Sequence, residues 1–238
     1  MTPLLPLARE LKLRLSSGRG AAYDREAREV MRRVLRFDSI ALDIGANFGS
    51  VLRDLLKVAP FGRHHAFEPL PELAAALRRR FPNVAIHEVA LSNRVGATSF
   101  VHVRGDPGLS GIHPVHRAAG ILECETITVR SDRLDNTIDA DTRVDLVKVD
   151  VEGAEFWVFE GGRELLARDR PVVLFESGGR AADLYEGSTP EAIHRLLADC
   201  GLKVNLMARW LADQPALSEP EFGYQIRTAG SYCFIAHR

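Results

Sequence analysis

The sequence predicts an α/β fold with a doubly wound, mostly parallel sheet. Three observations carry this prediction. Short apolar stretches alternate with amphipathic helical stretches along most of the chain, which is the pattern of parallel strands joined by helices. The first apolar stretch ends in a turn bracketed by Gly45 and Gly49, and a helix follows it. Two late strands are separated by a loop and not by a helix, which predicts an antiparallel edge strand.

The composition is that of an ordinary globular protein. The 238 residues are 46% hydrophobic and 26% charged, which fits one large domain or a domain with an appendage. A formal net charge of −1 argues against a general polyanion binder, so no nucleic-acid partner is expected.

The cysteines and the first residues bear on where the protein works. Three dispersed cysteines argue against a disulfide framework or a cysteine zinc site and favour a reducing cytoplasm. Prolines and charges interrupt residues 1–15, so we expect no signal peptide, and no apolar run is long enough to span a membrane.

We predict that residues 1–39 form a basic helical extension at the N-terminus. This segment contains nine Lys and Arg residues and five Asp and Glu residues. Asp24 is a candidate N-cap for a helix with an apolar stripe. This helix either packs on the edge of the domain or on a dimer face, or it forms a docking arm for an anionic partner. The main domain is expected over residues 40–238.

The remaining elements follow from periodicity in chain order. Apolar runs predict strands at 40–44, 65–69, 84–91, 145–150 and 171–176. Helices are predicted at 51–59, at 71–80, after residue 150 with an interruption at Gly161-Gly162, and from residue 188. Alternation at 97–103 and 123–129 predicts an antiparallel ribbon around a loop. The closing strands are 202–207 and 232–236, and residues 208–230 are predicted to be a long surface loop.

Acidic residues stand at the ends of four predicted strands: Asp43, Glu68, Asp150 with Glu152, and Glu176. In a parallel sheet these ends line one rim, where open α/β sheets bind ligands. Carboxylates gathered in a cleft raise one another's pKa values unless something cationic or hydroxylated binds there.

The first turn indicates which ligand this rim binds. A carboxylate at Glu68 can take both hydroxyls of an adenosine ribose. The turn lacks the G-x-G-x-x-G spacing of a dinucleotide site, and Asp43 would repel a pyrophosphate but attract an ammonium group. S-adenosylmethionine has an adenosine, an ammonium and no phosphate. The alternative is that Asp43 and Glu68 only cap turns.

Four motifs resemble the FkbM family of S-adenosylmethionine-dependent methyltransferases. They are Asp43-Ile-Gly-Ala-Asn-Phe-Gly49, Phe67-Glu-Pro69, Ala90-Leu-Ser-Asn93 and Lys148-Val-Asp-Val-Glu-Gly-Ala-Glu155. The likeness covers about residues 38–207. It implies a seven-stranded Rossmann-like methyltransferase sheet and O-methylation of hydroxyls on sugars or natural products. It also implies a set of cofactor-binding residues: Asp43, Gly45, Ala46, Asn47 and Gly49 toward the methionine end, Glu68 at the ribose, and Pro69 and Leu91.

Asp150 and Glu152 are the first candidates for catalysis, with Lys148 close by. If the strand persists, alternation points the two carboxylates to one side. One of them could be the general base for a hydroxyl, or the pair could hold a divalent metal together with Glu176, or it could pair structurally with Lys148. The residues leave these roles open and do not favour a metal. In the predicted loop 104–120, His113 is the second candidate for a base, three residues before His116.

The sequence therefore predicts an S-adenosylmethionine-dependent O-methyltransferase acting on a hydroxyl of a sugar, glycan or natural product. The alternative is a catalytically silent cofactor-binding or assembly module with the same fold. The strand end at Asp150 lacks the aromatic and proline residues of enzymes that flip a base, which disfavours a nucleic-acid methyltransferase. The acceptor and a homodimer stay open at this point.

Overall fold

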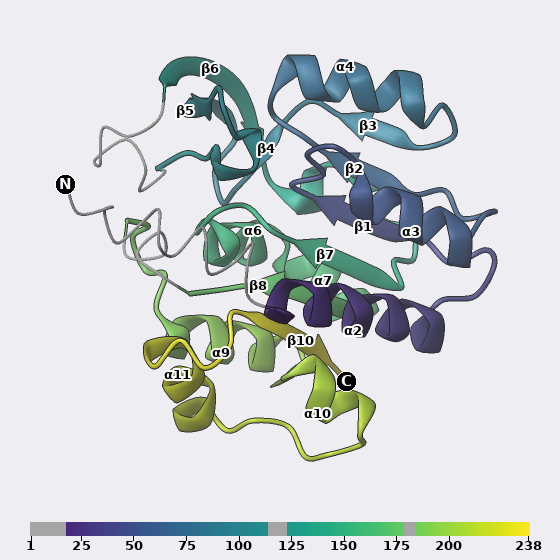
Figure 1. Cartoon of the computed structure of the whole chain (residues 1–238), viewed down its shortest axis with the longest axis vertical. Coiled ribbons are helices and arrows are strands. Elements are labelled where there is room, and N and C mark those ends of the chain that lie inside the picture. The colour runs from purple at the N-terminus through teal and green to yellow at the C-terminus, as the bar shows by residue number, and fades with distance from the viewer. Residues whose placement is uncertain (1–17, 114–122, 179–183) are drawn as a thin grey trace.

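The computed structural model describes residues 18–113, 123–178 and 184–238 (Figure 1). Seven strands form the central sheet in the order β3-β2-β1-β7-β8-β10-β9. Their bounds are β1 Ala41–Ile44, β2 His65–Phe67, β3 Ala85–His87, β7 Leu146–Val149, β8 Val172–Glu176, β9 Lys203–Asn205 and β10 Cys233–His237. The predicted seven-stranded, mostly parallel sheet is confirmed.

The antiparallel strand lies one position inside the edge. β10 pairs antiparallel with β8 on one side and with β9 on the other, so β9 is the edge strand and runs parallel to the rest. The sequence predicted the reversal but placed it at the edge. The chain returns from β9 through two helices and inserts its last strand between β8 and β9.

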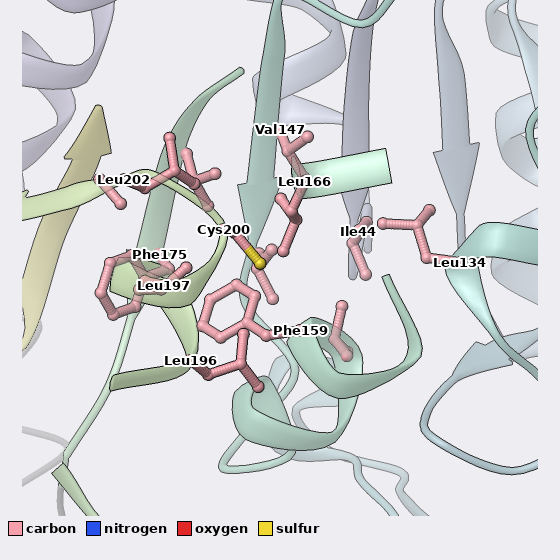
Figure 2. Close-up of a cluster of buried hydrophobic side chains, with 14 of the residues drawn as sticks. Ile44, Leu134, Val147, Phe159, Leu166, Phe175, Leu196, Leu197, Cys200 and Leu202 are labelled. Atoms are coloured by element: carbon pink, nitrogen blue, oxygen red, sulfur yellow. The ribbon is translucent and has the colours of Figure 1, made fainter. Parts of the chain in front are cut away.

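Helices cover both faces of the sheet, as side-chain alternation along the strands requires. One face packs against α2 (Gly18–Val34), α3 (Ser50–Val58), α4 (Pro71–Arg80) and α10 (Met207–Leu211). The other packs against α6 (Glu155–Gly161), α7 (Arg163–Asp169), α9 (Pro190–Asp199) and α11 (Glu219–Arg227). Figure 2 shows this second core, where Phe159 and Leu166 meet Val147 and Phe175 of the sheet.

A smaller sheet lies beside the amino-terminal half of the main one. It consists of β4 (Ala90–Leu91), β5 (Gly96–Val103) and β6 (Cys124–Asp132), with β5 and β6 antiparallel as predicted (Figure 1). The prediction of one strand at 84–91 is wrong. This segment forms two strands: β3 pairs with β2 in the main sheet, and β4 pairs with β6 in the smaller sheet. The short helix η1 (Pro107–Leu109) follows β5, and η2 (Leu134–Asn136) follows β6.

The C-terminal segment 208–230 is not the predicted surface loop, because it forms most of α10 and all of α11. Ser218 and Glu221 make a reciprocal capping box at the start of α11. Phe222 of this helix is fully buried in the core that also holds Phe175 and Phe234. A single aromatic anchor on a nine-residue helix leaves only a weak periodic signal.

Two further predictions concern helix ends. Gly161-Gly162 separates α6 from α7 as expected, and a Cβ at Gly161 would lie 2.1 Å from the carbonyl oxygen of Ser92. Asp24 lies inside α2 and does not cap it, because the helix begins at Gly18. Among the described residues, none of the helices combines the length and apolarity that a bilayer crossing demands.

Candidate active site

The turn between β1 and α3 is built from three residues with left-handed backbone. Gly45, Asn47 and Gly49 have φ of 77°, 48° and 74°. An asparagine tolerates this conformation, as the sequence predicted for Asn47. Gly45 must also be glycine for a second reason, since a Cβ there would lie 1.9 Å from the carbonyl oxygen of Asp150. The turn therefore lies directly against the end of β7.

Glu68 follows β2 and is tied to this turn. One carboxylate oxygen accepts the backbone N–H of Asn47 at 2.8 Å, and the other accepts that of Leu70 at 2.9 Å. Burial nevertheless raises the pKa of Glu68 above its ordinary value. Each oxygen retains a lone pair for a further donor.

Asp43 and Lys148 face each other across β1 and β7, in register and on the α2 side of the sheet. The Lys148 Nζ lies 3.6 Å from Asp43 Oδ1 and 3.4 Å from Asp150 Oδ2, and it donates to the carbonyl of Gly45 at 3.1 Å. Asp43 is fully buried, and burial raises its pKa to about 6 although Lys148 opposes the rise. Burial opposes the charge on Lys148, but Asp150 and Asp43 outweigh it and raise the lysine pKa. Lys148 is thus a fixed cation at neutral pH.

A cavity of about 270 Å³ opens at this end of the sheet. Most of the predicted site residues line it: Gly45, Ala46, Asn47, Glu68, Pro69, Leu91, Lys148, Asp150 and Glu152. Asp43 does not reach the cavity, because Lys148 occupies the position expected for a ligand ammonium. Gly49 packs against the ring of Phe81 beneath the turn.

Asn47 contributes an orphaned polar atom to this cavity. Its Oδ1 is buried and has no hydrogen-bond partner among the described residues. Its Nδ2 lies next to Gly108, where an added Cβ would come within 3.0 Å. The loop after β5 therefore closes over the turn and leaves the amide oxygen for a ligand.

The structure does not bring His113 into the cavity. Its backbone N–H donates to the Tyr185 hydroxyl at 3.0 Å, and its ring lies 5.2 Å and 6.0 Å from the rings of Tyr185 and Trp157. His113 thus belongs to an aromatic cluster with Trp157 of α6 and Tyr185 of the segment between β8 and α9. His116 lies outside the described residues.

The two acids after β7 do not follow the alternation predicted from a persistent strand. The strand ends at Val149, and Glu152 has φ of 55°. Glu155, which the sequence analysis left out of the site, holds this turn. Its Oε1 accepts the backbone N–H of Val151 at 3.1 Å and of Gly153 at 3.2 Å. Burial raises the pKa of Glu155 to about 7. The sequence feature that could have identified Glu155 is an acidic residue shortly after a strand end and at the start of a helix, where its carboxylate can accept unpaired backbone N–H groups.

Among the described residues, no group of three His, Cys, Asp or Glu side chains is arranged to hold a metal ion. The grouping of Asp150, Glu152 and Glu176 considered from the sequence is not such a group in the described part of the chain.

A family model for the FkbM methyltransferase domain matches residues 43–204. The chain belongs to the FkbM methyltransferase family. It is an S-adenosylmethionine-dependent methyltransferase, and the resemblance read from the motifs is confirmed.

Two curated relatives extend this finding. The 2-O-methyltransferase NoeI of Sinorhizobium fredii is 31% identical over 178 residues, which cover 68% of this FkbM methyltransferase and 72% of NoeI. The AMB antimetabolite synthetase AmbE of Pseudomonas aeruginosa is 29% identical over 214 residues, with 73% of this chain and only 10% of AmbE covered.

The fold is also that of a solved FkbM methyltransferase from Methylobacillus flagellatus. The TM-score is 0.53 at 16% identity, over 85% of this chain and 44% of the other. This chain therefore spans less than half the length of that solved structure. At this identity the likeness shows the fold alone.

Proposed function

We propose that this FkbM methyltransferase transfers a methyl group to a hydroxyl of a sugar, glycan or natural-product acceptor. The observation that carries the proposal is the convergence of Glu68, Asn47 and Asp150 on one cavity at the carboxyl end of the sheet. NoeI, named as a 2-O-methyltransferase, supports oxygen as the methyl acceptor.

The residues present fit S-adenosylmethionine. Glu68 offers lone pairs to the ribose hydroxyls, and the orphaned Oδ1 of Asn47 offers an acceptor beside the glycine turn. Leu70, Val89 and Phe100 line the same cavity and supply an apolar slot for an adenine. Asp43 acts through Lys148, which it holds in place, and so it positions the site without touching the ligand.

When bound, the cofactor supplies a methyl group on a positively charged sulfur. Asp150 is the candidate general base, since it lines the cavity and Lys148 fixes its carboxylate from one side. Asp150 would accept the proton of an acceptor hydroxyl that donates to it, and the cofactor would supply the methyl group and leave as neutral S-adenosylhomocysteine. Glu152 contributes negative charge nearby, and Lys148 stays protonated.

The experiment compares the wild type with Asp150→Asn. Calorimetry with S-adenosylmethionine, S-adenosylhomocysteine and NAD should show binding of the first two and none of NAD. The Asp150→Asn variant should bind S-adenosylhomocysteine as the wild type does but lose 100-fold or more in methyl transfer to a hydroxylated acceptor. Unchanged turnover of this variant would contradict the role of Asp150.

A catalytically silent module is the alternative. It predicts cofactor binding without methyl transfer to any acceptor in a screen of sugars, glycans and hydroxylated natural products. The pair of cavity-lining acids at the end of β7 favours the enzyme, because carboxylates confined together cost free energy that a binding module has no need to spend.

A further inference from the structure

We propose that the wall built by α2 and α10 is the acceptor subsite, and that it binds an apolar portion attached to the hydroxylated acceptor. The inference deepens the proposed function and rests on it. Four side chains carry it, namely Tyr23, Ala27 and Met31 of α2 and Met207 at the start of α10, all of which line the cavity.

The two helices of this wall lie outside the residues that the family model matches. The family match runs from residue 43 to residue 204, so α2 precedes it and α10 follows it. The turn, Glu68, Lys148 and Asp150 all lie within the match. The cavity therefore has one part made from residues inside the family match and another made from segments outside it, where substrate-binding residues are often found.

The α2 residues form one stripe and the helix is held firmly. Tyr23, Ala27 and Met31 recur every four residues, so they share one face of α2. At the other end, Arg33 lies over the ring of Trp210 at 4.7 Å and donates to the carbonyl of Leu211 at 3.2 Å. The Tyr23 hydroxyl lies 3.2 Å from that of Ser231. The wall is therefore preformed.

The buried part of the wall is apolar, and the exposed Asp24 of α2 is, among the described residues, the wall's one acidic member. Met31 and Met207 are 2% and 4% exposed, and Leu174 of β8 continues the surface between them and the sheet. Methionine side chains adapt to irregular apolar shapes, and such a surface offers an acceptor hydroxyl few partners. A purely polar acceptor would leave this half of the cavity unmatched, whereas an alkyl or aromatic portion would bury it.

The wall joins the reactive corner through β8 and β10. Cys233 is the cross-strand partner of Glu176, with its Sγ 3.7 Å from the Glu176 carboxylate. Both residues line the cavity, as does Asp150 on the neighbouring strand. An acceptor whose apolar portion lies on Met31 and Met207 therefore directs its hydroxyls toward Glu176 and Asp150.

The test measures binding of octyl β-glucoside and methyl β-glucoside, below micellar concentrations, to the full chain saturated with S-adenosylhomocysteine. We expect the octyl compound to bind at least tenfold more tightly. The double variant Met31→Gln with Met207→Gln, close in volume but polar, should reduce this advantage to less than threefold. Val30→Ala is the matched control, since Val30 is fully buried on α2 but does not line the cavity, and it should keep the advantage.

A second variant guards against failure of the double variant to fold. Ala27→Leu fills the wall without a polar group and should weaken octyl β-glucoside binding at least fivefold. Equal affinity of the two glucosides for the wild type, or an octyl advantage that survives in the folded Gln and Leu variants, would overturn the subsite. Affinity for S-adenosylhomocysteine should be unchanged in all variants. If the wild type does not bind S-adenosylhomocysteine, the proposed function is overturned instead. The comparison of the two glucosides on the cofactor-free chain would then still decide whether the subsite exists.

Discussion

Three buried carboxylates at this site differ in the groups that contact them. Glu68 is held by two backbone N–H groups, Asp43 by a buried lysine, and Glu155 by the amides of the turn that it closes. Since all three are buried, each carries a raised pKa, but only Glu68 lines the main cavity. Position relative to the cavity, and not acidity, therefore distinguishes Glu68, which we propose binds the ribose, from Asp43 and Glu155.

Replacing Glu68 by alanine should weaken S-adenosylmethionine binding by about 1–3 kcal/mol, because the ribose would lose its charged acceptor. Isothermal titration measures the change. Glu72→Gln is the control, since Glu72 is exposed in the first turn of α4. A Glu68→Ala variant that folds and binds the cofactor as tightly as the control would remove the ribose assignment.

Glu155 should give the stability of the protein a distinct pH dependence. Burial raises its pKa in the folded chain to about 7 from an ordinary value of 4.5, so between these values the folded state keeps a proton that the unfolded chain releases. Stability from this group is therefore fully present below about pH 4.5 and is lost as the pH rises to about 7, by about 2–3 kcal/mol.

The Glu155→Gln variant keeps an oxygen for the two turn amides but does not titrate. Urea unfolding of both proteins from pH 4.5 to 8 measures the difference. Relative to the wild type, the variant should become more stable as the pH rises. Parallel curves for the two proteins would show that Glu155 titrates normally.

At the scale of elements, the turn between β1 and α3 positions the cavity by contact with β7. Gly45 lies against the Asp150 carbonyl and Lys148 donates to the Gly45 carbonyl, so the glycine turn and the acidic strand end form one unit. Glu155, the first residue of α6, closes that unit from below by binding the amides between β7 and the helix. A substitution that disturbs the glycine turn should therefore also disturb the acidic end of β7.

Gly45→Ala should destabilise the protein by about 2–4 kcal/mol and abolish cofactor binding, because the added methyl group meets backbone and the residue has positive φ. Thermal unfolding and titration with S-adenosylhomocysteine measure both effects. Gly105→Ala is the matched control, since an added Cβ there meets nothing within 4 Å, and its effect should stay within about 0.5 kcal/mol. Wild-type behaviour of Gly45→Ala would mean that the turn can move away from β7.

The molecule as a whole is a sheet with two cores, and the cavity belongs to one of them. Asp43, Lys148 and Glu176 point to the α2 side, because they occupy equivalent alternate positions on β1, β7 and β8. Asp150 directly follows β7, and its carboxylate lies 3.4 Å from the Lys148 Nζ. On the opposite face, α6, α7, α9 and α11 form the apolar core of Figure 2. The reactive groups are therefore confined to one side, where α2 and α10 cover them.

Ligand binding should stabilise the whole chain. S-adenosylhomocysteine at 100 times its Kd should add about 2.7 kcal/mol. For a chain of this size that corresponds to a rise of about 5–10 °C in Tm, while NAD at the same concentration should leave Tm unchanged. Differential scanning fluorimetry measures both. A rise with NAD equal to that with S-adenosylhomocysteine would contradict the discrimination inferred from the turn.

Much of this arrangement was predictable because it depends on local signals. Each correctly predicted feature depends on residues that are close together in the sequence. These features are the glycine turn, the acids at strand ends, the antiparallel ribbon and the break at Gly161-Gly162. The errors lie where distant packing decides. The buried Phe222 anchors α11 to the core, and pairing with β6 splits the strand predicted at 84–91.

The amino-acid sequence by itself determined the family, the sheet and the identity of the residues around the cofactor turn, because backbone conformation and charge at a strand end are local properties. Only the tertiary structure decided that Lys148 covers Asp43, that Glu155 holds the turn after β7, that His113 lies away from the cavity, and that α2 and α10 build its second wall. These facts depend on which residues from distant segments come into register, and strand pairing and helix packing set that register only in the folded chain.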